Sequence, residues 1–371
     1  MINVLYISHE SKELLGSTLS LANMLNSVKE EVKPTVVLPR KGKAYDYLQG
    51  LGYPCRIVPF RLNIAPKRFR TLKHVPSKLV DYCVNGTAIW RLRKIVEKEN
   101  IQLIHSNSSV VTIGYKLARA CGVKHVWHLR EFQDLDFGFT PFTGWNRLLA
   151  MVHGSDAVIA ITNAVAAHFG ISGKPGCHIV YNAVRKSADI CHAAEKSATI
   201  LFCGHVTPNK GAEEALDIFT GFHKEHPGYK LYYLGSVNGD YKDYLERKAG
   251  RHGVADAVEF LGYMNDVKAY MEKASALLMC SRNEALGRVT VEAMFYGCPV
   301  LGYSSGGTKE LISDGVNGFL FTSADEAIAK LRIAVSSDNK RIIDNAHEFV
   351  RQNFTEEVYR EKILSIYKSL L

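Results

Sequence analysis

The sequence of 371 residues contains 8 cysteines but no C-x-x-C pair. Cysteines scattered in this way argue against a disulfide framework and a zinc site, both of which need several cysteines at defined spacings. No apolar run approaches the ~20 residues that span a bilayer. The first eight residues include no basic segment and no small-residue cleavage site. We therefore expect a first strand there and a cytoplasmic protein with reduced thiols.

The chain also lacks the G-x-G-x-x-G fingerprint that dinucleotide-binding dehydrogenases carry after their first strand. A partial match to a P-loop runs from Gly302 to Gly307, but Thr308-Lys309 follows it in the reverse of the Walker A order. Hydride transfer and ATP hydrolysis are therefore poorly supported.

Short apolar runs alternate with amphipathic helical stretches along the whole chain, which is typical of α/β proteins with doubly wound parallel sheets. The chain is longer than a typical single domain, and its length fits two domains of about 150–200 residues. The pattern restarts after residues 184–197, which include few large apolar side chains. We expect two Rossmann-like domains that face each other across a cleft, residues 1–183 and 184–353, with the final helix 354–371 packed back on the first.

Two glutamates separated by seven residues follow a predicted buried strand and reach into the next predicted helix. Glu284 lies on the loop that leaves the strand, and Glu292 lies about one turn into the helix. The helix N-terminus between them has unpaired backbone amides that suit a phosphate. Carboxylates on both sides of a phosphate site can accept hydrogen bonds from sugar and ribose hydroxyls. This arrangement points to a glycosyltransferase that uses a nucleotide sugar.

Three further residues fit such a site, although each also has an ordinary structural explanation. Gly16 follows the first strand, where a bare backbone can approach a phosphate, but it is equally suited to a plain turn. Lys210 follows the first strand of the second half and can neutralise a leaving diphosphate, or can be an exposed loop lysine. His128 closes a first-half strand, where histidines are often structural.

Over nearly its full length the chain resembles retaining glycosyltransferases of family 4 with the GT-B fold. The resemblance rests on Glu284-x7-Glu292-Ala293-Met294-x-x-Gly297-Cys298-Pro299-Val300, on Gly306-Gly307 with Glu310, on Gly204 to Gly211 and on Asn265-Asp266. The segment His128-Leu129-Arg130-Glu131-Phe132 is similar to enzymes that build bacterial capsules, exopolysaccharides and lipopolysaccharides.

The resemblance implies a role for each candidate residue. Glu292 would hold the ribose hydroxyls, Glu284 the hydroxyls of the donor sugar, and His128 would contact the transferred sugar. The diphosphate would be bound by Lys210, by amides near Leu286, Gly287 and Arg288, and by the backbone at Gly16. Asp266 would lie beside the base. No cofactor is implied, and the donor would be a UDP- or GDP-linked sugar.

The sequence departs from the family pattern at two of these positions. His205 stands where the family usually has an arginine, and Gly16 stands alone where two glycines are usual. A neutral imidazole supplies less charge to a leaving diphosphate. A catalytically silent nucleotide-sugar-binding subunit therefore stays open as an alternative, as does another GT-B enzyme such as a sugar-nucleotide epimerase.

The net charge of +9 is concentrated in one part of the chain. Residues 56–78 contain seven lysines and arginines and no acid, apolar residues interleave with them, and a basic helical stretch follows as far as residue 94. Such a segment suits an anionic membrane surface, which favours peripheral membrane association and a glycan or lipid-linked acceptor. A solvated loop and helix face is an equally good explanation. No motif supports nucleic-acid binding.

Asp134-x-Asp136 matches the metal-binding Asp-x-Asp of a different glycosyltransferase fold. It lies in a first-half loop, far along the sequence from the predicted phosphate site, so we expect no metal there.

Overall fold

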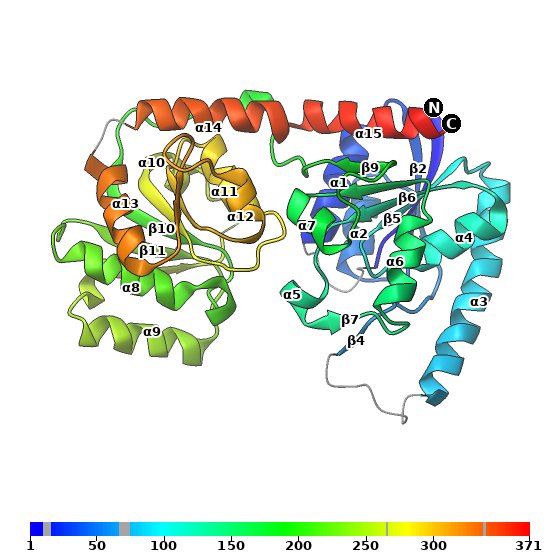
Figure 1. Ribbon diagram of the computed structural model, residues 1–371, viewed down its shortest axis with the longest axis horizontal. Coiled ribbons are helices and arrows are strands. Elements are labelled where there is room, and N and C mark those ends of the chain that lie inside the picture. The colour runs from blue at the N-terminus through cyan, green and yellow to red at the C-terminus, as the bar shows by residue number, and fades with distance from the viewer. Residues whose placement is uncertain (10–15, 67–74, 265, 337–338) are drawn as a thin grey trace. The chain divides into compact units, whose positions relative to one another are not determined.

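The computed structural model describes residues 1–9, 16–66, 75–264, 266–336 and 339–371 (Figure 1). The chain packs as two units, Met1–Ala183 with Glu356–Leu371, and Val184–Thr355. Asn265 and four basic residues of the predicted membrane segment, Lys67, Arg68, Arg70 and Lys73, lie outside the described residues.

The first unit is built on a seven-stranded parallel sheet in the order β3-β2-β1-β5-β6-β8-β9. Its strands are β1 (Ile2–Ile7), β2 (Val32–Leu38), β3 (Cys55–Ile57), β5 (Leu103–Asn107), β6 (Lys124–Leu129), β8 (Ala157–Ala160) and β9 (Cys177–Ile179). Two short strands, β4 (Ala65–Pro66) and β7 (Phe139–Thr140), pair in antiparallel fashion outside this sheet.

Helices cover both faces of this sheet, as parallel strands require. The helices of this unit are α1 (Gly16–Ser27), α2 (Lys43–Gly50), α3 (Val75–Lys98), α4 (Ile113–Cys121), α5 (Asp134–Phe137), α6 (Trp145–His153), α7 (Asn163–His168) and α15 (Glu356–Leu370). The last helix, α15, packs on α1, so Tyr359 and Ile363 share one buried core with Leu21, Val4 and Tyr6. Helices α3 and α4 supply the core on the opposite face.

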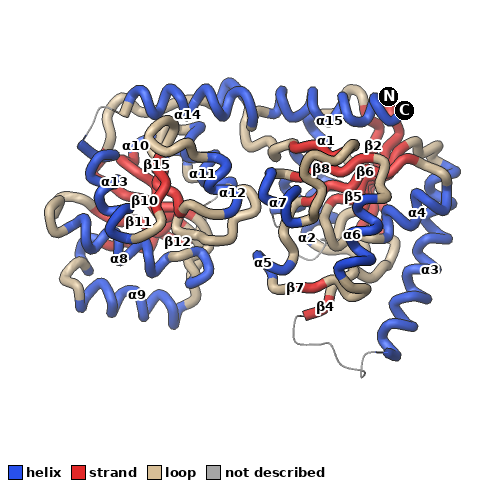
Figure 2. The backbone as a smooth tube through the Cα atoms, in the orientation of Figure 1, coloured by secondary structure: helices blue, strands red, loops and turns tan. Residues whose placement is uncertain are grey.

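The second unit is built on a six-stranded parallel sheet in the order β12-β11-β10-β13-β14-β15, gathered between helices (Figure 2). Its strands are β10 (Ser197–Cys203), β11 (Lys230–Leu234), β12 (Val258–Gly262), β13 (Ala274–Met279), β14 (Val300–Tyr303) and β15 (Phe319–Phe321). Its helices are α8 (Ala212–His223), α9 (Gly239–Arg251), α10 (Lys268–Lys273), α11 (Arg288–Phe295), α12 (Gly306–Leu311), α13 (Ala324–Ser336) and α14 (Lys340–Asn353).

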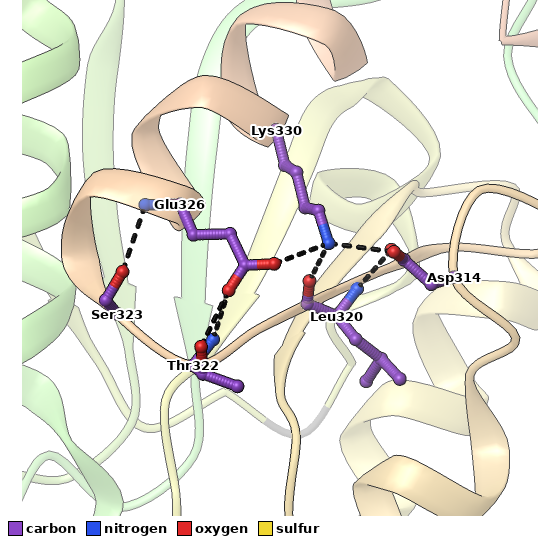
Figure 3. Close-up of polar contacts among 6 residues, drawn as sticks. All are labelled: Asp314, Leu320, Thr322, Ser323, Glu326 and Lys330. Atoms are coloured by element: carbon purple, nitrogen blue, oxygen red, sulfur yellow. Dashed lines mark hydrogen bonds and ion pairs between the residues drawn. The ribbon is translucent and has the colours of Figure 1, made fainter.

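A polar cluster of Asp314, Leu320, Thr322, Ser323, Glu326 and Lys330 connects the start of α13 to the edge strand β15 (Figure 3). The Glu326 carboxylate accepts hydrogen bonds from the Thr322 amide at 2.7 Å and from the Lys330 ammonium at 2.9 Å. Lys330 also donates to Asp314 at 2.8 Å and to the Leu320 carbonyl oxygen. The hydrogen bonds from Lys330 and Thr322 lower the pKa of Glu326 from 4.5 to about 2. The short strand β15 is therefore held by side chains as well as by its ladder.

Candidate functional site

The loop that carries Lys210 lies against the end of β13 in the second unit. It runs from Gly204, at the end of β10, through a single 3-10 turn to Gly211, which has a φ of +73°. A Cβ atom at Gly211 would stand 2.6 Å from the Cys280 carbonyl oxygen, closer than real contacts allow. Only glycine therefore lets this loop approach the loop that follows β13.

That approach brings Lys210 and Glu284 together. The Lys210 Nζ donates to Glu284 Oε1 at 2.5 Å, and the side chains are 43% and 14% exposed. The two residues are 74 positions apart in the sequence, yet they form one partly buried ion pair at the carboxyl edge of the sheet. Ligands of parallel α/β sheets bind at this edge.

Two glycines of α12, Gly306 and Gly307, pack against the backbone of the Glu284 loop. The Gly307 amide donates to the Glu284 carbonyl oxygen at 2.7 Å. A Cβ atom at Gly306 would stand 2.7 Å from that oxygen, and one at Gly307 would stand 2.7 Å from the Ala285 oxygen. Gly306 and Gly307, of which Gly307 belongs to the partial P-loop match, therefore allow this loop to pack closely against α12.

Helix α11 begins at Arg288, immediately after Gly287, which has a φ of +81°. The Arg288 Nε donates to Glu292 Oε1 at 3.2 Å, and Arg185 lies 3.7 Å from the same oxygen. Glu292 is 12% exposed, so this second predicted carboxylate also belongs to a partly buried ion-pair cluster. Leu286, the other predicted residue of the loop, is buried.

The sequence analysis missed two buried hydroxyls beside this helix start. Thr290 and Thr308 are fully buried, and their Oγ1 atoms have no hydrogen-bond partner among the described residues. Both hydroxyls would lie within 3.7 Å of a Cβ atom at Gly287. No sequence signal marks them, because buried threonines are common and the spacing 290–308 matches no motif.

His205 and Asp266 lie at the same edge, at the ends of β10 and β12, and both are exposed. Asp266 accepts a hydrogen bond from the Lys268 amide at 2.9 Å. Between these two strands lies β11, which ends just before Gly235. A Cβ atom at Gly235 would stand 1.8 Å from the Gly204 carbonyl oxygen, so only glycine fits there. The described contacts do not join His205 or Asp266 to either ion pair, so their predicted roles stay predictions.

In the first unit, Gly16 begins α1 and is exposed. Within the described residues, a Cβ atom added to it meets nothing within 4 Å. The open space is compatible with a close approach by a phosphate and equally with a plain turn.

His128 lies in β6 and is fully buried. Its Nδ1 is 3.3 Å from His105 Nε2 and 3.3 Å from an Arg130 nitrogen, while its Nε2 has no partner in the described part of the chain. Burial, together with the Arg130 charge and His105, holds the pKa of His128 well below its usual 6.5, so the ring is neutral. The ring is buried in the structure, and its contact with a sugar stays a prediction.

A strained polar turn beside His128 also escaped the sequence analysis. Glu131 Oε1 accepts from the Ser108 hydroxyl at 2.6 Å and from the Ser109 amide at 2.7 Å. Ser108 has a φ of 155° and Gln133 has a φ of 77°. Residues other than glycine rarely adopt such positive φ angles. Strain of this kind is often found near functional sites. The sequence gives no sign of it, because neither residue is a glycine, asparagine or aspartate, the types that most often adopt a positive φ.

Asp134 and Asp136 each contact a different neighbouring residue. Asp134 lies 3.0 Å from His168 Nε2, and Asp136 accepts from the Phe132 amide at 2.9 Å. The described residues include no group of three or more histidine, cysteine or acidic side chains arranged to hold a metal.

Comparison with known proteins gives a consistent family. The family model described as "Glycosyltransferase Family 4" matches residues 18–187, and the model "Glycosyl transferases group 1" matches residues 185–353. The crystal structure of Anabaena HepE in complex with UDP aligns over 100% of both chains, with a TM-score of 0.82 and 19% identity. Another structure of that protein is in complex with UDP-glucose and has a TM-score of 0.77. This likeness establishes the fold.

Curated relatives match over shorter stretches. An α-1,4-N-acetyl-D-galactosaminyltransferase of Campylobacter jejuni, named for a PP-undecaprenol-linked substrate, is 32% identical over 42% of this chain and 44% of its own length. A lipopolysaccharide core biosynthesis glycosyltransferase of Rhizobium meliloti is 29% identical over 38% of this chain and 43% of its own. The chain spans less than half the length of these relatives and of three others, at 49%, 42% and 44%. The two family models together span residues 18–353, and the chain belongs to the family 4-like glycosyltransferases of the GT-B fold.

Proposed function

We propose that this protein is a retaining glycosyltransferase that moves a sugar from a nucleotide diphosphate sugar to a glycan or lipid-linked acceptor in the synthesis of a bacterial surface polysaccharide. One observation carries the proposal: two acid–base pairs, Lys210 with Glu284 and Arg288 with Glu292, flank the start of α11. Each pair contains a cation for a phosphate and a carboxylate for a hydroxyl.

The pairs suit a donor that brings both kinds of group. A diphosphate attracts Lys210 and Arg288 and competes with the two carboxylates for them. Glu284 is then free to accept hydrogen bonds from sugar hydroxyls, and Glu292 from ribose hydroxyls. Gly287 and the amides that follow it bind phosphate oxygens at the helix N-terminus, and Asp266 lies beside the base. For Gly16 and His128 of the first unit we propose the roles that the resemblance implies, contacts to the diphosphate and to the sugar.

Transfer with retention needs little covalent chemistry from the protein. In this mechanism the acceptor attacks the face that the diphosphate leaves, and a leaving phosphate oxygen takes the acceptor's proton. The protein positions both substrates and stabilises the negative charge that grows on the leaving diphosphate. We propose that lysine and arginine of this chain supply the compensating positive charge without a metal ion.

The donor class is tested by measuring thermal unfolding with UDP-, GDP-, ADP- and CDP-sugars and with the free nucleotides. A ligand at 100 times its Kd should stabilise the folded state by about 2.7 kcal/mol, which is a readily measured shift. We expect a response to UDP- or GDP-sugars, since the similar Anabaena structures contain UDP and UDP-glucose. No response to any nucleotide would contradict the proposal.

The exposed His205 keeps a second candidate open, a nucleotide-sugar-binding subunit without turnover. Such a subunit would respond in the unfolding assay, yet it would release no free nucleotide when donor and acceptor are both present. An epimerase, in contrast, would convert the donor without any acceptor. Release of nucleotide that depends on an acceptor separates transfer from both alternatives.

We also propose that the first unit binds an anionic membrane surface through residues 56–94. Among the described residues, no helix is long and apolar enough to cross a bilayer. Helix α3 exposes two large aromatic side chains on one face, Tyr82 at 78% and Trp90 at 57%. The Lys94 ammonium lies 3.7 Å from the centre of the Trp90 ring. Aromatic and basic side chains together suit a membrane interface.

Replacing Arg91, Arg93 and Lys94 by glutamine should weaken binding to vesicles that contain anionic lipid. Each basic residue near such a surface contributes about 1 kcal/mol, so the triple variant should bind about 100-fold more weakly. The matched control replaces three basic residues of α9 in the second unit, Lys242, Arg247 and Arg251. Equal vesicle binding by wild type and the α3 variant in a sedimentation assay would refute the membrane proposal.

A further inference from the structure

The first unit contains a buried chain of hydrogen bonds that begins at Arg130 and passes through His128. One Arg130 Nη lies 3.3 Å from His128 Nδ1. An arginine side chain donates hydrogen bonds and cannot accept them. The Nδ1 atom must therefore offer its lone pair, and the single proton of the neutral ring is on Nε2.

Arg130 is itself held rigidly in this position. It is 7% exposed, its Nε donates to Asn107 Oδ1 at 2.6 Å, and its other Nη donates to Asn182 Oδ1 at 2.5 Å. Each guanidinium nitrogen therefore has its own partner. A group fixed on three sides cannot rotate away from His128 without leaving buried polar atoms unpaired, which is costly.

The chain continues from His128 to the last helix. His105 Nε2 lies 3.3 Å from His128 Nδ1, and His105 Nδ1 lies 2.7 Å from the Tyr367 hydroxyl on α15. Two lone pairs facing each other at 3.3 Å would repel, so His105 donates from Nε2. Its Nδ1 then faces the Tyr367 hydroxyl as an acceptor, and that hydroxyl also lies 3.1 Å from the Tyr6 hydroxyl. Tyr367 and His105 are 262 residues apart, so this contact forms only when α15 packs on the first unit.

The arrangement leaves one polar atom of His128 without a partner. The Nε2–H is buried and forms no hydrogen bond with the described residues. Most buried donors in proteins are satisfied, so an unpaired one at the carboxyl end of a parallel strand indicates a group that a ligand completes.

We propose that Arg130, His105 and Tyr367 are positioning residues that hold His128 in its Nε2-protonated form, so that this N–H donates to an oxygen of the transferred sugar. The inference rests on the proposed function, in which His128 contacts that sugar. It adds that the contact depends on an arginine two residues further along the chain and on a tyrosine of the last helix.

The protonated nitrogen can be identified without any activity measurement. In protein labelled with ¹⁵N-histidine, the nitrogen shifts and their couplings to ring protons distinguish the two tautomers, and His128→Gln assigns the signal. We expect wild-type His128 to be protonated on Nε2 alone. In Arg130→Met, which removes the donor but keeps a long side chain, we expect a mixture of tautomers. A single Nε2-protonated form in that variant would overturn the proposal.

Kinetics provide the second readout. We expect kcat to fall about 10-fold in Tyr367→Phe and more in Arg130→Met, with partial recovery in Arg130→Lys, which keeps a donor. A 10-fold loss corresponds to about 1.4 kcal/mol in the barrier. Ser369→Ala is the control, because that hydroxyl lies on the same helix and donates to the Ile366 carbonyl oxygen of that helix at 2.8 Å.

The outcomes separate this inference from the proposed function. Equal kcat values in wild type, Tyr367→Phe and Arg130→Met, all folded, would overturn the positioning role. If the wild-type protein transfers no sugar, the proposed function fails, while the tautomer measurement still decides whether Arg130 fixes the proton on Nε2. Tyr367→Phe removes only one hydroxyl group. The kcat of this variant therefore tests the positioning role even if Arg130→Met does not fold.

Discussion

Glu284→Ala is expected to abolish sugar transfer and to leave the fold intact. The Glu284 carboxylate lies on a loop at the carboxyl edge of the second sheet, and its one described side-chain partner is Lys210, which is 43% exposed. The backbone of the loop is held by the Gly307 amide, and that bond does not depend on the side chain. Since partly exposed ion pairs stabilise proteins by about 1 kcal/mol or less, the loss of stability should be small.

The loss of transfer should be large because positioning is most of what the protein supplies. A sugar displaced by about 1 Å can react about 100-fold more slowly. We therefore expect at least that loss in a nucleotide-release assay for Glu284→Ala and for Glu284→Gln, which keeps the size of the side chain.

The matched control for this variant is Glu259→Ala, in the same unit. Glu259 forms an ion pair with Lys230 at 2.7 Å, near the starts of β12 and β11 and so at the other end of these strands. Full activity in this control and loss in both Glu284 variants, with equal unfolding temperatures, is the expected result. If Glu284→Ala unfolds, or if it transfers sugar at the wild-type rate, the assignment of Glu284 to the donor sugar is wrong.

Much of the fold could be predicted because buried parallel strands are marked by continuous apolar runs. Strands such as β10 and β13 stand out in this way, and their order along the chain predicts two doubly wound sheets. The prediction missed β15 and β9, which have three residues each. Their stability comes from neighbours, as the cluster around Glu326 shows for β15, and a run of three residues gives no periodic signal.

Helices were missed where the local pattern was broken. The apolar pattern of the sequence predicts a helix over residues 87–98, whereas α3 begins at Val75 and continues through Gly86. Glycine weakens an isolated helix by about 1 kcal/mol, but packing against the sheet can offset that cost. The residues before the last helix are mostly polar, yet they form α14 (Lys340–Asn353). This helix buries a narrow stripe of side chains that includes Ile343, Ala346 and Val350.

The candidate site could be predicted only in part, for a related reason. Glu284 and Glu292 were found because their spacing along the chain is short and fixed. The contact of Lys210 with Glu284 spans 74 residues, and that of Tyr367 with His105 spans 262. Contacts of this kind depend on the strand order and on α15 packing against α1, and no local pattern encodes them.

Lys210→Met is expected to reduce kcat by about 100- to 1,000-fold, the effect of removing one group that stabilises developing negative charge. The charge on the leaving diphosphate grows as the glycosidic bond breaks, so the loss should be larger in kcat than in donor affinity. Methionine keeps most of the apolar stem of lysine, and the unfolding temperature should change little. Lys230→Met, which removes the cation of the Lys230–Glu259 pair, is the matched control and should keep wild-type activity.

The pairing of Lys210 with Glu284 adds an expectation that distinguishes this mechanism from simple charge attraction. The Lys210 ammonium donates to the Glu284 carboxylate at 2.5 Å, so a diphosphate that reaches Lys210 competes with Glu284 for it. Glu284→Gln removes that competition. Free UDP or GDP should therefore bind Glu284→Gln at least as tightly as wild type in calorimetry, although the variant transfers no sugar, and should bind Lys210→Met more weakly. Weaker binding of the free nucleotide to Glu284→Gln would mean that the carboxylate contacts the nucleotide itself, and the division of roles between cation and carboxylate would be wrong.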